Sequence, residues 1–184
     1  MKINFITGNP QKVAIAQAAL GADFQIVSRD LDIPEPQSMS LQEIALDSAY
    51  KALQIVKEPL MLTDSGFFID GLNGFPGPFV KWTNKTLTNH DFLAMLLNKS
   101  TRRAHTEDCL VYIAPGQNPI VFYSQVSGEI VEDAKQSKSS ISQLFIPDEL
   151  GHPVSDLTYE KEAKFWSQHI TNYSQLKAYL LSQK

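Results

Sequence analysis

The apolar and polar residues of the first half predict strands that alternate with helices. Short apolar runs are typical of buried strands, and apolar residues that recur every three or four positions are typical of helices. The predicted strands are 2–7, 24–27 and 60–63, and the predicted helices are 10–20 and 40–57. Gly21 ends the first helix and Pro59 follows the second, since proline cannot continue a helix. A strand, a tight turn and a helix in this order open an α/β unit.

The second half is predicted to contain more strand. The predicted elements are a helix capped by Thr88 to Asp91, a strand over 105–113, one or two strands over 120–131, a strand over 144–147, and helices over 159–169 and 174–181. The first two of these strands are joined by a turn rich in Pro and Gly, which favours an antiparallel hairpin. Polar residues dominate 134–142, and we expect a mobile loop there.

The stretch from Leu62 to Trp82 combines an acid, glycines and aromatic residues. We expect the preceding strand to end at 63–66, where Asp64 lies beside a hydroxyl and the conformationally free Gly66. Several Phe residues and a Trp follow, and burying each of these rings contributes a few kcal/mol. We therefore predict a partly buried loop system with Asp64 at its mouth. The alternative is that Asp64 only caps a turn.

Composition indicates a soluble globular protein with one domain over residues 1–184. Hydrophobic residues make up 43% of the chain, and no apolar run approaches the roughly 20 residues of a transmembrane helix. The N-terminus lacks the pattern of a secretory signal, and the single Cys109 excludes an internal disulfide, so we expect a cytoplasmic protein. A formal net charge of −4 argues against nucleic-acid binding, and we expect no membrane partner.

The turn after the first predicted strand is a candidate anion site. Asn9 suits a helix N-cap and Pro10 the first helical position. The first helical turn is then expected to present free N–H groups and the positive end of the helix dipole beside Lys12. Many α/β proteins have a polar turn here without a ligand, so this pattern alone does not decide the function.

Two acids add a candidate metal site. Glu35 and Asp64 both lie in segments that follow predicted strands, where open α/β sheets gather ligands. Mg²⁺ prefers oxygen ligands and usually binds through one or two carboxylates together with substrate phosphates. These residues favour metal-assisted attack of water on a phosphate, with Asp64 orienting or deprotonating the water. The alternative for each acid is a turn cap or a solvated surface charge.

Three blocks of sequence resemble the noncanonical purine nucleoside triphosphate pyrophosphatases, which act on inosine and xanthosine triphosphates. The blocks are Thr7-Gly8-Asn9-Pro10-Gln11-Lys12, Pro34-Glu35-Pro36-Gln37, and Asp64-Ser65-Gly66-Phe67-Phe68 continuing through Leu72-Asn73-Gly74-Phe75-Pro76-Gly77-Pro78. Their order and spacing are similar to those of the family and cover about the first half of the chain.

The resemblance implies both a fold and an activity. The fold is α/β, with an elongated mixed central β-sheet flanked by helices and two lobes with a nucleotide cleft between them. The activity is Mg²⁺-dependent hydrolysis of a nucleoside triphosphate to the monophosphate and pyrophosphate by a homodimer.

The resemblance also implies a role for each matched residue. Lys12 and Asp64 are the expected catalytic residues, and Glu35 and Asp64 are the expected metal ligands. The expected substrate-binding residues are Thr7, Gly8, Asn9, Lys12, Ser65, Gly66, Ser167, Gln168 and His169.

The chain departs from the family pattern at several positions. The family usually has a second acid directly before the matched Asp64, where this chain has Thr63. Its aromatic base-stacking loop is replaced here by 139–143, which has no aromatic residue or acid. The family's Ser-His-Arg is here Ser167-Gln168-His169, and either Lys161 or Lys164 stands for the lysine that precedes it.

These departures gather where the family reads the base, whereas the phosphate-binding residues are nearly complete. The sequence therefore predicts a nucleoside triphosphate pyrophosphatase with altered or relaxed base choice. The alternative is a catalytically degenerate family member that binds a nucleotide or a partner, for which Thr63 is the main argument.

Overall fold

The computed structural model describes residues 1–133 and 141–183. Its strands are β1 (Lys2–Ile6), β2 (Gln25–Arg29), β3 (Leu60–Ile69), β4 (Pro76–Gly77), β5 (Arg103–Ile113), β6 (Ile120–Ile130) and β7 (Phe145–Pro147). Its helices are α1 (Pro10–Leu20), α2 (Leu41–Val56), α3 (Val80–Thr86), α4 (Asn89–Met95), α5 (Ile141–Leu144), α6 (Tyr159–His169) and α7 (Asn172–Ser182), with 3₁₀ turns at Asp70–Leu72 and Val154–Asp156. The loop expected over 134–142 lies mostly outside the described residues.

The strands form a mixed sheet, which confirms the predicted α/β class. Its order is β2-β1-β3-β5-β6-β7, and β4 pairs with β3. Strand β1 is parallel to both β2 and β3, whereas β3–β4 and β6–β7 are antiparallel. Parallel neighbours need crossover connections, and α1 and α2 supply them.

The chain divides into two compact units, which we describe separately. Unit 1 contains 1–64, 108–124 and 163–184, and unit 2 contains 65–107 and 125–162. The chain passes from unit 1 to unit 2 inside β3, between Asp64 and Ser65. A single domain over 1–184 stays a prediction.

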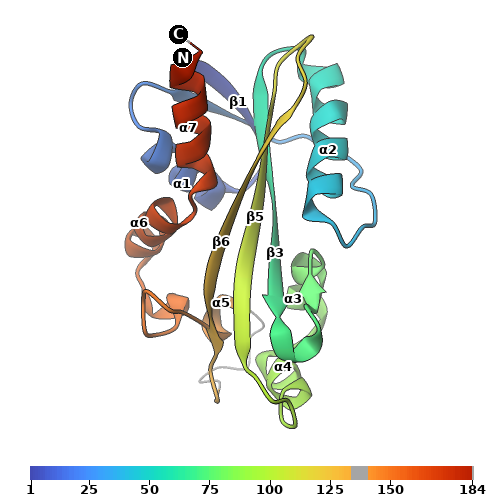
Figure 1. Ribbon diagram of the computed structural model, residues 1–184, viewed down its shortest axis with the longest axis vertical. Coiled ribbons are helices and arrows are strands. Elements are labelled where there is room, and N and C mark those ends of the chain that lie inside the picture. The colour runs from blue at the N-terminus through green and yellow to red at the C-terminus, as the bar shows by residue number, and fades with distance from the viewer. Residues whose placement is uncertain (134–140, 184) are drawn as a thin grey trace. The chain divides into compact units, whose positions relative to one another are not determined.

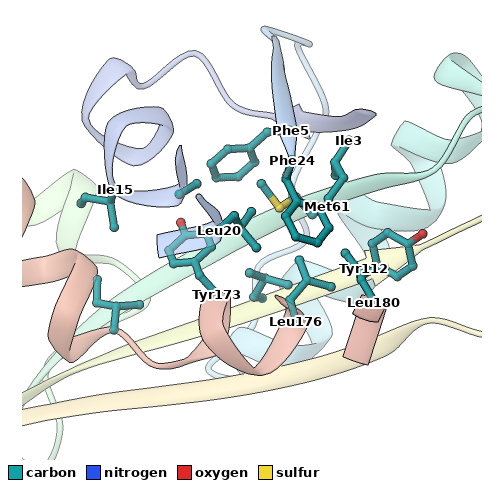
Figure 2. Close-up of a cluster of buried hydrophobic side chains, with 13 residues drawn as sticks. Ile3, Phe5, Ile15, Leu20, Phe24, Met61, Tyr112, Tyr173, Leu176 and Leu180 are labelled. Carbon is teal, nitrogen blue, oxygen red and sulfur yellow. The ribbon is translucent and has the colours of Figure 1, made fainter. Parts of the chain in front are cut away.

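Unit 1 buries a core between its strands and two of its helices. Helices α1 and α7 lie on one side of β1 and β3, and α2 lies on the other (Figure 1). Figure 2 shows the buried apolar cluster on the side of the sheet that α1 and α7 cover. The cluster consists of Ile3, Phe5, Ile15, Ala16, Leu20, Phe24, Met61, Leu110, Tyr112, Ile170, Tyr173, Leu176 and Leu180. Burial of this apolar surface holds α1 and α7 on the sheet.

Unit 2 is held by aromatic and charged contacts. The rings of Phe67 and Phe145 meet edge to face with centroids 5.1 Å apart. The guanidinium of Arg103 donates two hydrogen bonds of 2.7 Å to the carboxylate of Asp148. This contact holds the pKa of Asp148 below its ordinary value.

Strand β3 is longer than the sequence pattern predicted. It continues through 64–66 to Ile69, so Asp64 lies inside a strand and not in a loop. The reason is tertiary: Phe67 and Phe68 pair with Gly77 and Pro76 of β4, and this ladder extends the strand beyond the acid. Asn73 and Gly74 form a turn after β3 and have positive φ angles of 55° and 83°.

Candidate active site

The turn between β1 and α1 is built by side chains that hold its backbone. The Asn9 carboxamide oxygen accepts hydrogen bonds from the amides of Gln11 (2.9 Å) and Lys12 (3.4 Å). The Thr7 hydroxyl accepts from the amide of Asn9 at 3.1 Å. Asn9 is thus the predicted N-cap, and Pro10 is the first helical residue.

The same contacts correct one expectation about this turn. Free N–H groups were expected at the start of α1, but Pro10 has none and Asn9 satisfies those of Gln11 and Lys12. The Val13 amide bonds to the Asn9 carbonyl. An anion bound here would therefore depend on side-chain donors more than on the helix amides.

Lys12 brings a positive charge from α1 to β3. Its ammonium group donates to the main-chain carbonyl oxygen of Thr63 at 3.1 Å, and the contact is partly buried. Thr63 directly precedes Asp64, so this bond holds the lysine beside the strand that carries the candidate catalytic acid. The structure therefore brings α1 and the Asp64 strand together within unit 1.

Asp64 is half-buried on β3. Successive side chains of a strand point to opposite faces, so Asp64 and Thr63 face opposite sides of the sheet. Ser65 is also half-buried, and Gly66 is buried. A Cβ on Gly66 would meet the Phe68 ring at 2.7 Å and the Gly77 backbone at 3.2 Å, so this glycine is required by close packing.

Glu35 lies exposed in the loop that precedes α2. The ammonium group of Lys51 holds this loop by donating to the carbonyl oxygen of Pro34 at 2.8 Å. Helix α2 starts at the predicted place, with the Ser40 hydroxyl accepting from the Glu43 amide at 3.3 Å. The Glu43 carboxylate accepts from Ser38.

Helix α6 ends with Ser167, Gln168 and His169, the three residues that were expected to contact the base. The Ser167 hydroxyl donates to the Lys164 carbonyl at 2.8 Å, and Gln168 is exposed. Nδ1 of His169 lies 2.8 Å from the Phe165 carbonyl oxygen, and the two rings stack with centroids 4.2 Å apart. A carbonyl oxygen only accepts, so Nδ1 carries the proton of this contact and Nε2 of the neutral ring is an acceptor.

Asp30 and Asp108 are two further acids of unit 1 that were not identified from the sequence pattern. The carboxylate of Asp30 lies against Gly8, where an added Cβ would come within 2.5 Å of its Oδ1. Asp108 on β5 is 8% exposed. Asp108 shares the alternating row of Leu110 and Tyr112, but it directly follows the polar residues that begin β5, so the sequence pattern did not set it apart.

The acids of the described residues do not form a metal site by themselves. Among 1–133 and 141–183, no three His, Cys, Asp or Glu side chains lie together in a way that could hold a metal ion. Glu35 and Asp64 offer only oxygen donors, which suit Mg²⁺ when phosphates and water complete the coordination. The donor chemistry therefore fits a metal that arrives with its substrate.

The sequence matches a known family along most of its length. The model described as the Ham1 family matches residues 3–177. A dITP/XTP pyrophosphatase of Methanopyrus kandleri is 33% identical over 166 residues, which cover 89% of this chain and 88% of that protein. An inosine triphosphate pyrophosphatase of Ajellomyces capsulatus is 37% identical over 145 residues, 78% of each chain.

Solved structures with the same fold agree with this match. The Ham1 protein of Staphylococcus aureus superposes with a TM-score of 0.79 at 22% identity, covering 100% of both chains. A HAM1 protein from Coxiella burnetii gives a TM-score of 0.80 at 20% identity, covering 99% of both chains. The resemblance inferred from the sequence blocks is confirmed.

Proposed function

This chain belongs to the Ham1 family, and on that premise we propose that it is a nucleoside triphosphate pyrophosphatase. The proposed reaction cleaves the anhydride bond between the α- and β-phosphates and gives a nucleoside monophosphate and pyrophosphate. One observation carries the proposal: the Lys12 ammonium group is bound to the residue before Asp64, at 3.1 Å from the Thr63 carbonyl. A phosphate-binding cation and a candidate general base thus belong to one local structure.

Lys12 binds the triphosphate in this proposal. An ammonium group has three donors, and the Thr63 carbonyl takes one of them, so two remain for phosphate oxygens. The Asn9 carboxamide oxygen is used by the helix cap, which leaves its NH₂ group as a further donor. Thr7 and Gly8 shape the turn around these donors.

Asp64 orients the attacking water and accepts its proton. A half-buried carboxylate suits this role, because partial removal from bulk water strengthens its interaction with a nearby proton donor. Glu35 and Asp64 would hold Mg²⁺ together with the substrate phosphates. When bound, the metal neutralises negative charge on those phosphates.

Base choice is the part of the reaction that we expect to differ in this chain. Where a keto oxygen of a purine needs a donor, the Nδ1–H of His169 is already used by the Phe165 carbonyl. Arginine would present a fixed fork of donors instead. Gln168 is exposed and offers both a donor and an acceptor. We therefore propose a weakened preference for keto purines.

The test is pyrophosphate release with Mg²⁺ from inosine, xanthosine, guanosine, adenosine and pyrimidine triphosphates. Release from several of them at similar kcat/KM is the expected result. A strong preference for inosine and xanthosine triphosphates would refute the altered base choice and leave the pyrophosphatase proposal intact. Absence of release from all of them, with the same preparation binding a triphosphate, would refute hydrolysis.

A second candidate is a family member that binds a nucleotide or a partner without catalysis. Thr63 favours it, because a hydroxyl replaces the acid that the family usually has next to the matched Asp64. The discriminating result is triphosphate binding by calorimetry together with no pyrophosphate release at any Mg²⁺ concentration. Turnover that Asp64→Asn abolishes would exclude this candidate.

The oligomeric state and the cellular location of this chain are also proposals. We propose a homodimer, as the family resemblance implies, and a cytoplasmic location, as the single Cys109 favours. No helix of the described residues is long and apolar enough to cross a membrane. Light scattering on the purified chain tests the dimer, and a mass of about 20.6 kDa at all concentrations would contradict it.

A further inference from the structure

A polar cluster ends the core of unit 1 directly beneath the candidate active site. On β3, Met61 belongs to the apolar cluster, and Thr63 lies two residues further on the same face. On the neighbouring strand β5, Leu110 belongs to that cluster, and Asp108 lies two residues before it. Both rows of core residues therefore end in a polar side chain on the face that α7 covers.

Tyr173 of α7 connects these two rows. Its ring packs in the core shown in Figure 2, and its side chain is 2% exposed. Tyr173 shares the apolar cluster with Met61 and Leu110, and the residue before it, Asn172, is bonded to the Asp108 carbonyl, so Tyr173 lies beside both Thr63 and Asp108. The buried Thr63 hydroxyl has no hydrogen-bond partner in the described residues, so Tyr173 confines the Thr63 side chain by packing against it.

The start of α7 is fixed independently. The side-chain amide of Asn172, which is completely buried, donates to the main-chain carbonyl of Asp108 at 3.4 Å. The Thr171 amide donates to the Ser124 hydroxyl at 2.8 Å. These bonds hold the neighbours of Tyr173 against β5 and β6, which restricts where the tyrosine hydroxyl can lie.

Thr63 joins this cluster to the residues proposed for catalysis. Its carbonyl accepts the Lys12 ammonium group, and its peptide bond leads into Asp64. Its side chain points to the opposite face from Asp64, toward Tyr173. A displacement of Thr63 would therefore move both the acceptor of Lys12 and the base of the Asp64 side chain.

We propose that Tyr173 and Asp108 are positioning residues, which hold Thr63 and thereby the Lys12–Asp64 pair, and that Asp108 excludes an acid from position 63. The first part rests on the proposed function, whereas the second concerns folding alone. An acid at position 63 would bring a second carboxylate to a buried site where one is already present, and like charges in such a site repel strongly.

The exclusion of an acid from position 63 is tested by measuring the unfolding temperature in the absence of metal and substrate. We expect Thr63→Glu to lower it by several degrees in the otherwise unchanged chain. In the Asp108→Asn background the same substitution should lower it by less than half as much. Equal losses in the two backgrounds would overturn the exclusion, and this measurement decides it even for a chain without turnover.

The positioning role is tested by Tyr173→Phe, which keeps the ring in the core and removes the hydroxyl. We expect kcat for pyrophosphate release to fall about tenfold and KM to rise severalfold, because Thr63 holds Lys12 as well as Asp64. Tyr179→Phe is the matched control, since Tyr179 lies on the same helix and its ring packs on Tyr112 and Phe122. It should leave kcat unchanged.

A kcat for Tyr173→Phe equal to that of the Tyr179→Phe control would overturn the positioning role. Wild-type protein without any release would refute the proposed function instead, because the comparison requires a measurable wild-type rate. A loss of kcat in both variants would assign the effect to general packing of α7 and also overturn the proposal.

Discussion

Under our proposal, the side chain of Asn9 serves both folding and ligand binding. Its carboxamide oxygen caps α1 by accepting from two backbone amides, which leaves the NH₂ group as its only donor toward an anion. The cap accounts for the residue's identity without any substrate. Its two functions can be separated because they use different atoms.

The substitution Asn9→Asp separates the capping role of Asn9 from its proposed role as a hydrogen-bond donor to the substrate. The carboxylate can still accept from the amides of Gln11 and Lys12, and aspartate is as good an N-cap as asparagine. The unfolding temperature should stay within about 2 °C, since the change in cap energy is a few tenths of a kcal/mol. The KM for triphosphate should rise at least tenfold, because a donor becomes a negative charge. An unchanged KM would limit Asn9 to the cap.

Asp64→Asn tests the proposed general base. The substitution keeps the shape of the side chain and removes its ability to accept a proton, so kcat should fall by about 10²–10⁴. The fold should survive, as judged by circular dichroism. Asp70→Asn, at an exposed acid beyond the end of β3, is the control and should leave kcat unchanged. Turnover retained by Asp64→Asn would remove this residue from the mechanism.

Strand β3 is the element that determines what surrounds Asp64. Because it continues to Ile69, Asp64 is fixed by the strand backbone and not by a loop. A rigid element holds a catalytic side chain more accurately than a loop does. The continuation depends on close packing at Gly66, where the Phe68 ring leaves no room for a Cβ.

Gly66→Ala should destabilise this part of β3. The added methyl group would meet the ring of Phe68 and the backbone of Gly77, and overpacking of this kind costs about 1–3 kcal/mol. Urea unfolding measures the loss. Adding Phe68→Leu should recover part of it, since the ring is the nearer neighbour. A stability equal to wild type would show that β3 and β4 separate easily at this point.

At the scale of the whole molecule, alkaline pH should act through Tyr173. Burial raises its pKa, and the charge of Asp108 raises it further, so the folded protein keeps this proton where the unfolded chain loses it above a pKa of about 10. This contribution to the free energy of unfolding is fully present below about pH 10. Above that pH the free energy of unfolding falls by about 1.4 kcal/mol per pH unit for one proton.

Urea unfolding between pH 9 and 11.5 checks this dependence. The free energy of unfolding of Tyr173→Phe should fall less steeply above pH 10 than that of the wild type. Tyr159→Phe, which changes a tyrosine that is 58% exposed, should keep the wild-type slope. The same slope in all three proteins would show that Tyr173 does not govern the alkaline limit.

The elements with local signals were predictable from the sequence. Asn9 and Pro10 marked the start of α1, Gly21 its end, and Thr88 with Asp91 the capping box of α4. These motifs act within one helical turn, so the sequence alone contains their cause.

The features that depend on distant residues were not predictable in this way. The length of β3 depends on its pairing with β4. The role of Asp108 depends on α7, whose Tyr173 lies 65 positions further along the chain. Asn9, Lys12 and Asp64 were candidates from the local sequence pattern, and the family resemblance added a specific role for each. The Lys12–Thr63 bond became visible only in the structure.

The bond between Lys12 and the Thr63 carbonyl has an evolutionary consequence. Every amino acid carries a main-chain carbonyl, so substitution at position 63 removes no acceptor and the lysine keeps its anchor. An ancestor with the acid that is usual in the family could lose it without losing the lysine's position. Under our proposal, an acid at position 63 is unfavourable for as long as Asp108 is present. Restoring an acid at position 63 alone would then destabilise the protein.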